Sequence, residues 1–212
     1  MRVLVTGGAG YIGTGLCQAL LALKEVESVT VYDNLSRHNF NLFIGVQKFD
    51  NRYHFIEGDI LDSRNLRKAV SKADVVFHLA AKVTTPFADQ DAHLFEQVNH
   101  WGTAEVTYAA EESNVQHLIY LSSVSVYGSG ELAKGIDAEL NPKTFYGISK
   151  MRAEEHVRRL ENKVKTTIIR CGNVYGYNKS MRFDAVINKL LFEANFHRRI
   201  NIHGTGEQHR PF

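Results

Sequence analysis

The chain has 212 residues, of which 44% are hydrophobic and 23% are charged, and its formal net charge is +2. This composition is typical of a globular protein with one well-buried domain and some length beyond it, and it argues against a disordered chain. The small net charge, without a long basic run, gives no support to nucleic-acid binding, and no apolar run approaches the roughly 20 residues of a membrane span.

Apolar runs and helical patterns alternate along the first 170 residues. The apolar runs predict strands at residues 2–6, 29–32, 53–57, 75–79, 118–122 and 166–170. The helical spacing predicts helices at 11–24, 62–70 (capped by Asp62 or Ser63), about 92–112 and about 146–161. Strands joined by helices at this rhythm are typical of an α/β fold with a doubly wound parallel sheet. In such a sheet the ligand site lies at the carboxyl ends of the strands.

After residue 170 the rhythm changes. The pattern predicts one helix at about 182–194, a short strand at 200–203 and a turn at 204–206. These residues are too few to bury a core of their own. We therefore interpret residues 1–170 as one domain and residues 171–212 as the beginning of a smaller, truncated lobe.

Cys17 and Cys171 are the two cysteines, and they show neither metal-ligand nor CxxC spacing. We expect buried, free thiols of a reducing compartment and no metal site. The strand pattern begins at residue 2, which leaves no room for a signal peptide. We therefore expect the protein in the cytoplasm.

A glycine-rich turn follows the first predicted strand, with the sequence Thr6-Gly7-Gly8-Ala9-Gly10-Tyr11-Ile12-Gly13. It fits the G-x-G-x-x-G pattern, in which glycines let backbone N–H groups approach a pyrophosphate at a helix N-terminus. Asp33 ends the second predicted strand, 20 residues after Gly13, and a carboxylate there accepts ribose hydroxyls and repels a 2′-phosphate. The pattern predicts NAD, although Arg37 leaves NADP open. Asp59 and Ile60 are placed to contact the adenine, but Asp59 is equally well explained as a helix cap.

Tyr146 and Lys150 lie four residues apart in a predicted helix and so share one face. An ammonium beside a phenol favours the phenolate, whose unperturbed pKa near ~10 otherwise makes it a poor base at neutral pH. Together with Ser123 and the glycine-rich turn, this pair predicts hydride transfer with a tyrosine acid/base. We expect His78 to be a packed strand residue, and Asn99 to satisfy backbone groups within its own helix.

These motifs, in this order, resemble the extended short-chain dehydrogenases/reductases, specifically the NAD-dependent nucleotide-sugar epimerase/dehydratase group. The resemblance covers essentially the whole chain and implies a Rossmann sheet with bound NAD. It also rests on the segments Ser122-Ser123-Val124-Ser125-Val126-Tyr127-Gly128 and Asn173-Val174-Tyr175-Gly176. The cofactor residues that it implies are Gly7, Gly10, Tyr11, Ile12, Gly13, Asp33, Asn34, Asp59, Ile60, Leu79, Ala80, Ala81, Asn99 and Lys150.

The resemblance also implies roles toward a nucleotide-diphosphate sugar. Tyr146 would exchange the proton of a sugar hydroxyl, Ser123 would hydrogen-bond the same oxygen, and Lys150 would bind the nicotinamide ribose. In addition, Thr84 would line the sugar pocket, while Asn173 and Arg210 would hold the diphosphate.

The residues after Ser123 distinguish reactions within the group. The 4,6-dehydratases resemble Thr-Asp-Glu-x-Tyr-Gly, and Val124 and Ser125 stand where that pattern has its carboxylates. Because a valine cannot protonate a leaving hydroxyl, the sequence favours an epimerase that abstracts hydride transiently at a sugar carbon, expected to be C4. The alternatives are a dehydratase or decarboxylase, an NAD(P)-dependent reductase, and a non-catalytic dinucleotide sensor.

The resemblance further suggests a homodimer, in which the helix of residues 92–112 and the Tyr146 helix pack across a two-fold axis. Phe95, Trp101 and Tyr108 would serve either that interface or the core. Neither a nucleic acid nor a membrane is an expected partner.

Overall fold

The structure is a computed structural model that describes residues 1–44, 51–83, 91–130, 135–202 and 204–205. Its centre is a six-stranded sheet with the strand order β3-β2-β1-β4-β5-β6, in which every neighbouring pair is parallel. The strands are β1 Arg2–Thr6, β2 Ser28–Asp33, β3 Tyr53–Glu57, β4 Val75–His78, β5 His117–Ser123 and β6 Lys165–Cys171. The predicted doubly wound parallel fold is thus confirmed. The order reverses between β1 and β4, and a ligand crevice is expected at that point.

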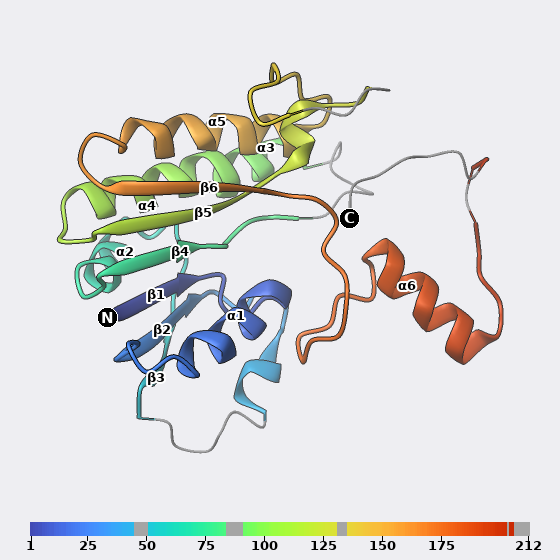
Figure 1. Ribbon diagram of the computed structural model, residues 1–212, viewed down its shortest axis with the longest axis horizontal. Helices are drawn as coiled ribbons and strands as arrows, with labels where there is room; N and C mark the ends of the chain where they lie inside the picture. Colours follow the sequence, from blue (N-terminus) through green and yellow to red (C-terminus); the bar gives the residue numbers. More distant parts are fainter. Residues whose placement is uncertain (45–50, 84–90, 131–134, 203, 206–212) are drawn as a thin grey trace.

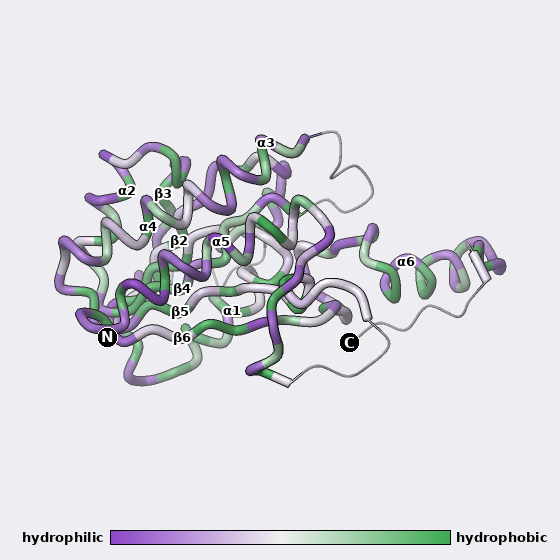
Figure 2. The backbone as a smooth tube through the Cα atoms, turned by 90° about the horizontal axis from the view of Figure 1, so that it is seen from above, coloured by the Kyte–Doolittle hydropathy of each residue, from purple (hydrophilic) through white to green (hydrophobic). Residues whose placement is uncertain are grey.

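Helices cover both faces of this sheet (Figure 1). The α-helices are α1 Tyr11–Leu21, α2 Ser63–Val70, α3 Ala92–Phe95, α4 Gly102–Glu111, α5 Phe145–Arg159 and α6 Val186–Phe192. Short 3-10 segments are η1 Phe40–Phe43 and η3 Val124–Tyr127, and π-helical segments are η2 Glu96–Trp101 and η4 Glu193–His197. Viewed from two directions, α6 lies beyond the carboxyl ends of the strands, away from the sheet (Figures 1 and 2).

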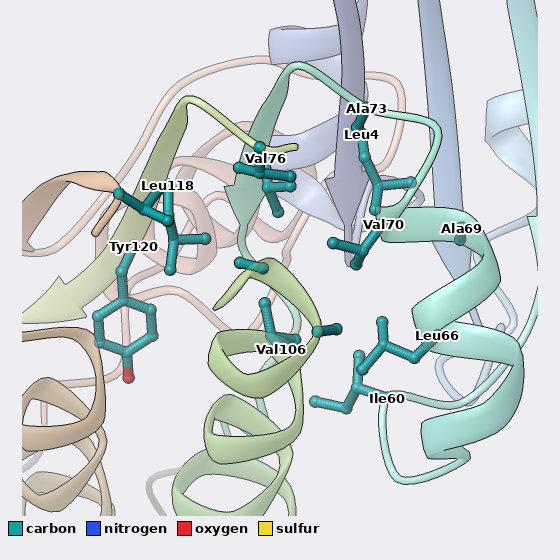
Figure 3. Close-up of a cluster of buried hydrophobic side chains, with 14 of the residues drawn as sticks. Leu4, Ile60, Leu66, Ala69, Val70, Ala73, Val76, Val106, Leu118 and Tyr120 are labelled. Carbon is teal, nitrogen blue, oxygen red and sulfur yellow. The ribbon is translucent and has the colours of Figure 1, made fainter. Parts of the chain in front are cut away.

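Two hydrophobic clusters hold the layers together because successive residues of a strand face opposite sides. Val3 and Val5 of β1 pack with Cys17 and Leu20 of α1 on one face. Leu4, between them, joins the cluster beneath α2, α4 and α5 on the other face (Figure 3). The strands are apolar on both sides, as expected for a parallel sheet with two helical layers.

The helix expected over residues 92–112 is not uniform. It consists of α3, the π-helical segment η2 and α4 in succession. A π-segment shifts the side chains that follow it relative to a regular helix, and such segments recur at functional sites. Asn99 of η2 makes contacts outside its own helix, which are described below.

Several predicted boundaries were wrong. The helices α1 and α5 end at Leu21 and Arg159, and α6 begins at Val186 instead of near residue 182. No strand forms over residues 200–202, since the Asn201 N–H donates to the side chain of Glu193 instead of a neighbouring strand. Residue 203, and residue 206 of the predicted turn at 204–206, lie outside the described residues.

The two cysteines differ in burial. Cys17 is buried as expected, but Cys171 is only half-buried; both are free thiols.

None of the helices in the described part of the chain combines the length and apolarity that a bilayer crossing requires.

Candidate functional site

The residues singled out in the sequence gather along the carboxyl edge of the sheet. Gly7 follows β1, Asp33 ends β2, Asp59 follows β3, Ala80 follows β4 and Ser123 ends β5. Parallel strands bring these positions to one edge, although they are up to 116 residues apart (123 minus 7). The fold therefore brings the glycine-rich turn and the Tyr146 helix to the same edge of the sheet, where the ligand site of such a fold is expected.

The glycine-rich turn is built for close backbone approach. Gly7 has φ +71°, and a Cβ there would lie 2.5 Å from the backbone nitrogen of Ala80. A Cβ on Gly13 would lie 2.6 Å from the Gly7 carbonyl oxygen. The N-cap of α1 is Gly10, which has no side chain to satisfy the first N–H groups of the helix. This arrangement fits a dinucleotide pyrophosphate bound against the turn and the start of α1.

Asp33 is joined to this turn by hydrogen bonds. Its carboxylate accepts from the backbone N–H groups of Ala9 (3.0 Å) and Leu35 (2.8 Å). Burial raises the pKa of Asp33, while these two backbone bonds oppose that rise. Each carboxylate oxygen can accept more than one bond, so Asp33 retains the capacity to accept from a ribose. Arg37, the residue that left NADP open, donates to the Val83 carbonyl at 2.7 Å.

Asp59 does not cap a helix, so that interpretation was wrong. The N-cap of α2 is Asp62, whose carboxylate accepts from the Asn65 N–H. Asp59 instead accepts from the Leu61 N–H and from the side chain of Asn34, which links the ends of β2 and β3. The Ile60 side chain is 5% exposed and belongs to the core, so an adenine contact there would have to use its main chain.

Asn99 reaches outside its own helix, contrary to expectation. Its side chain accepts from the Lys82 N–H at 2.8 Å and donates to the Lys82 carbonyl at 3.2 Å and to Ser149 Oγ at 3.1 Å. It thereby fixes the chain that leaves β4 through Leu79, Ala80 and Ala81, beside Gly7. The side chain of Asn99 is fully buried, and all three contacts come from parts of the chain outside η2.

His78 is fully buried between two threonines, as expected of a packed strand residue. Its Nδ1 lies 2.7 Å from Thr6 Oγ1 and its Nε2 lies 2.9 Å from Thr103 Oγ1. Because Thr103 donates its own proton to the Asn99 carbonyl, Nε2–H is assigned as the donor to Thr103, and Nδ1 accepts from Thr6. Burial, aided by the charge of Lys150, lowers the pKa of His78 to about 3, so the ring is neutral.

Tyr146 and Ser123 meet where α5 passes the end of β5. Burial raises the pKa of the Tyr146 phenol, while a hydrogen bond with Ser123 and the charge of Arg182 oppose that rise. The phenol is therefore protonated at neutral pH in this structure. Ser123 Oγ also accepts from Ser125 Oγ at 2.9 Å and caps η3 through the Ser125 N–H. The ring of Phe95 packs edge-on against Tyr146 and is buried, so Phe95 belongs to the core.

Lys150 lies one turn further along α5 and is 2% exposed. Its Nζ donates to the Leu121 carbonyl at 2.8 Å and sits 4.6 Å from the centre of the Tyr120 ring. Burial lowers the pKa of Lys150 to about 7, and the carboxylate of Glu154 opposes the shift. The expected influence of Lys150 on the phenol is not evident here, since the groups that shift the pKa of Tyr146 are Ser123, Arg182 and Cys171.

Comparison with known proteins identifies the family of this chain. The profile of the "NAD dependent epimerase/dehydratase family" matches residues 3–212. The chain belongs to this family. The expected cofactor is consistent with it, because the family is NAD-dependent.

Relatives of this family member carry out more than one reaction. The chain is 34% identical to dTDP-D-glucose 4,6-dehydratase of Bos taurus, over 100% of the chain and 60% of the relative. It is 30% identical to UDP-glucose 4-epimerase of Mycolicibacterium smegmatis, over 100% of the chain and 69% of the relative. The chain thus spans about 60% of the length of the mammalian dehydratase that it matches.

A solved structure of the family shows the same fold. UDP-glucuronic acid 4-epimerase from Bacillus cereus, in complex with UDP-glucuronic acid and NAD, superposes with a TM-score of 0.88 at 28% identity. The match covers 99% of this chain and 68% of that one.

Sequence reasoning missed Thr14, Ser180 and Asn188, and it missed the contacts that Tyr11, an expected cofactor residue, makes with the segment after β6. Tyr11 uses its hydroxyl to donate to the Gly176 carbonyl, and buried Asn188 donates to the same hydroxyl while accepting from the Gly176 N–H. Thr14 Oγ1 lies 2.9 Å from buried Ser180 Oγ. The segment after β6 is therefore joined by hydrogen bonds to the first turn of α1, which directly follows the glycine-rich turn in sequence. No periodic pattern signals these contacts, because they link single polar residues more than 160 positions apart.

Of the residues that the sequence assigned to the substrate, the structure describes some and not others. Thr84 and Arg210 lie outside the described residues. Asn173 is half-buried and lies two residues after Cys171, the end of β6, which pairs with Ser123 of β5. Arg182 was not singled out in the sequence, and its guanidinium pairs with Asp184 through two hydrogen bonds of 3.0 and 2.7 Å.

Proposed function

We propose that this protein is an NAD-dependent nucleotide-diphosphate-sugar epimerase that abstracts hydride transiently at a sugar carbon, C4 in the first instance, with Tyr146 as acid/base. The observation that supports this choice is that positions 124 and 125, which directly follow Ser123, carry no carboxylate. Val124 and Ser125 occupy the positions where the dehydratase pattern has Asp and Glu. In the described part of the chain, the groups that shift the pKa of Tyr146 include no carboxylate.

The chemistry follows from the placement of each group. NAD, when bound, supplies the reversible hydride acceptor. Tyr146 takes the proton of the sugar hydroxyl and returns it, while Ser123, hydrogen-bonded to Tyr146, orients the same oxygen. Lys150 binds the nicotinamide ribose and supplies the positive charge that lowers the pKa of the phenol in the loaded site. Elimination of water would need a further acid beside the sugar, and Val124 and Ser125 cannot provide one.

The cofactor assignments are proposals of the same kind. Gly7, Gly10, Tyr11, Ile12 and Gly13 would face the pyrophosphate, chiefly through their backbone N–H groups. The remaining proposed cofactor residues are Asp33, Asn34, Asp59, Ile60, Leu79, Ala80, Ala81 and Asn99, and the proposed substrate residues are Thr84, Asn173 and Arg210. We assign residues 1–170 to the NAD-binding domain and 171–212 to the start of the sugar-binding lobe.

Dehydration is the second candidate, because mammalian 4,6-dehydratases are 34% identical to this chain. A reductase using NADPH is disfavoured by Asp33, whose carboxylate would repel a 2′-phosphate.

The test is an incubation of the protein with NAD and a panel of nucleotide-diphosphate hexoses and uronic acids, followed by chromatography with mass detection. The proposal predicts a new peak of unchanged mass. A product lighter by one water, or by carbon dioxide, would establish the dehydratase or decarboxylase instead. In the same assay Tyr146→Phe should lose about 10²–10⁴-fold in turnover, the usual contribution of a general acid/base, and still bind NAD. A non-catalytic sensor would show no turnover in either form.

We further propose a homodimer that uses the outer face of η2, α4 and α5. Trp101 is 56% exposed and Tyr108 is 40% exposed on this face, unlike Phe95, which is buried. Large exposed aromatic side chains are enriched at interfaces. Sedimentation equilibrium should show a dimer that Trp101→Glu weakens, and a monomeric wild type at micromolar concentration would contradict it.

We keep the cytoplasm as the proposed compartment because both cysteines are free thiols. Cell fractionation would test this, and recovery of the protein from an oxidising compartment would contradict it.

A further inference from the structure

The carboxylate of Glu154 is a buried charged group close to Lys150 on α5, and it has no part in the chemistry proposed above. Glu154 follows Lys150 by one turn of α5 and is 1% exposed. Arg170 of β6 holds its carboxylate by two bonds, Nε to Oε1 at 2.9 Å and Nη2 to Oε2 at 2.7 Å. Ser122 of β5 donates to Oε1 at 2.6 Å. A single carboxylate therefore joins one helix to two strands.

Stability alone gives little reason for such a group. Removing two charges from water costs several kcal/mol per ion, and apolar residues of similar volume are often as stable in the same place. Ala153 and Val157, which stand close to Glu154 along α5, are both fully buried members of the hydrophobic core. The buried Glu154–Arg170 ion pair is therefore better explained by a role in function than by its contribution to stability.

The contacts of Glu154 lead directly to the reacting groups. Ser122, which Glu154 holds, lies between two residues of β5 that serve the site. One is Leu121, whose carbonyl accepts from Lys150 Nζ at 2.8 Å, and the other is Ser123, the partner of Tyr146. Fixing Ser122 therefore fixes the strand end on which both Lys150 and Tyr146 depend.

Glu154 is also the only carboxylate among the described groups that influence Lys150. The titratable groups that contact or influence Lys150 are Glu154 of α5, His78 of β4, Tyr120 of β5 and Cys171 of β6, and Tyr146 stands one turn before Lys150 on α5. Of these, His78 is neutral, and burial raises the pKa of both Tyr120 and Cys171, so neither is an anion at neutral pH. Burial raises the pKa of Glu154 too, but Arg170 and Ser122 more than reverse this, and Arg158 at 3.7 Å acts in the same direction.

We propose that Glu154, held by Arg170 and Ser122, is a positioning residue that keeps the buried Lys150 protonated and holds the Ser123 strand end against the Tyr146 helix. The inference rests on the role proposed for Lys150. Without the carboxylate, the neighbours that favour the charge of the desolvated ammonium, among the residues that the structure describes, are the Leu121 carbonyl and the Tyr120 ring. Lys150 would then lose its proton at a lower pH, and with it the charge that supports the phenolate.

The test measures Lys150 directly and needs no substrate. In protein labelled with [ε-13C]lysine, the 13Cε shift of Lys150, assigned by its absence in Lys150→Met, is followed against pH. We expect Glu154→Gln to lower the titration midpoint of Lys150 by about one pH unit or more, the usual effect of a nearby opposite charge. Glu155→Gln changes the same residue type at the next, exposed position of α5 and should leave the midpoint unchanged.

A second variant separates the effect of losing the Glu154 charge from the effect of leaving Arg170 without its partner. Glu154→Gln leaves Arg170 buried without its partner, and this could unfold the protein or lower the midpoint by itself. Glu154→Gln combined with Arg170→Gln removes both charges and should keep the lowered midpoint. A wild-type midpoint in either folded variant would overturn the inference. A lowered midpoint in a protein that converts no sugar would uphold the inference and refute the proposed function.

Discussion

At the scale of single residues, burial raises the pKa of the Tyr146 phenol and lowers the pKa of the Lys150 ammonium to about 7. These shifts are the opposite of those expected for a phenolate beside an ammonium. The spacing of Tyr146, Lys150 and Ser123 and their positions at strand or helix ends are local properties, so the sequence predicted these residues. It could not predict their electrostatic state, because that state depends on burial. Asn99 shows the same limit, since its partner Lys82 lies on another segment.

His78 provides a pH-dependence prediction at this scale. Its pKa is about 3 in the folded protein and 6.5 in an unfolded chain, so the unfolded state binds the extra proton between these values. The contribution of His78 to stability is therefore fully present above pH 6.5 and decreases as the pH falls toward 3. Between pH 7 and pH 5 the loss should be about 2 kcal/mol, because the full slope of 1.36 kcal/mol per pH unit applies only below pH 6.5.

Urea denaturation of wild type and His78→Gln at pH 7 and pH 5 measures this loss. The wild type should lose more stability than the variant over that range. Other histidines contribute to both proteins and cancel in the comparison. Equal losses in the two proteins would show that His78 takes up a proton in the folded state.

At the scale of elements, the alternation of strands and helices was predicted well because it follows from apolar periodicity. All six strands lie where the sequence placed them, within one or two residues at their ends. What the periodicity could not show was the π-helical segment η2 and the late start of α6. Each of these segments contains a side chain that bonds outside its own element, Asn99 to Lys82 and Asn188 to Tyr11.

The turn between β1 and α1 supports a prediction at this scale. Gly7→Ala would place a Cβ 2.5 Å from the Ala80 backbone on a residue with φ +71°. The backbone conformation alone costs about 1–2 kcal/mol for a non-glycine residue, and the contact with rigid backbone adds to this. We expect lower stability in urea denaturation and loss of NAD binding in calorimetry.

Gly135→Ala is the matched control, because a Cβ at Gly135 meets nothing within 4 Å. It should leave stability and NAD binding unchanged. If Gly7→Ala behaved like Gly135→Ala in both measurements, the turn would not be the close-approach site described here.

At the scale of the whole molecule, the carboxyl edge of the sheet brings together the glycine-rich turn, the Tyr146 helix and the segment after β6. The first two were predicted, because a parallel sheet places strand ends side by side. The attachment of the third to α1 through Tyr11, Asn188 and Ser180 was not, since it consists of isolated polar contacts between distant residues. A change in the position of this segment would therefore alter the hydrogen bonds of Tyr11 and Thr14 in the first turn of α1.

The central claim is that a hydride leaves the sugar and returns to the same molecule. The most direct measurement is the product assay run with a nucleotide sugar that carries deuterium at C4, with the position of the label read by NMR. An epimerase of the proposed kind should give a C4 epimer of unchanged mass that retains deuterium at C4. Deuterium lost to water, or found at C6 in a product lighter by one water, would contradict the account.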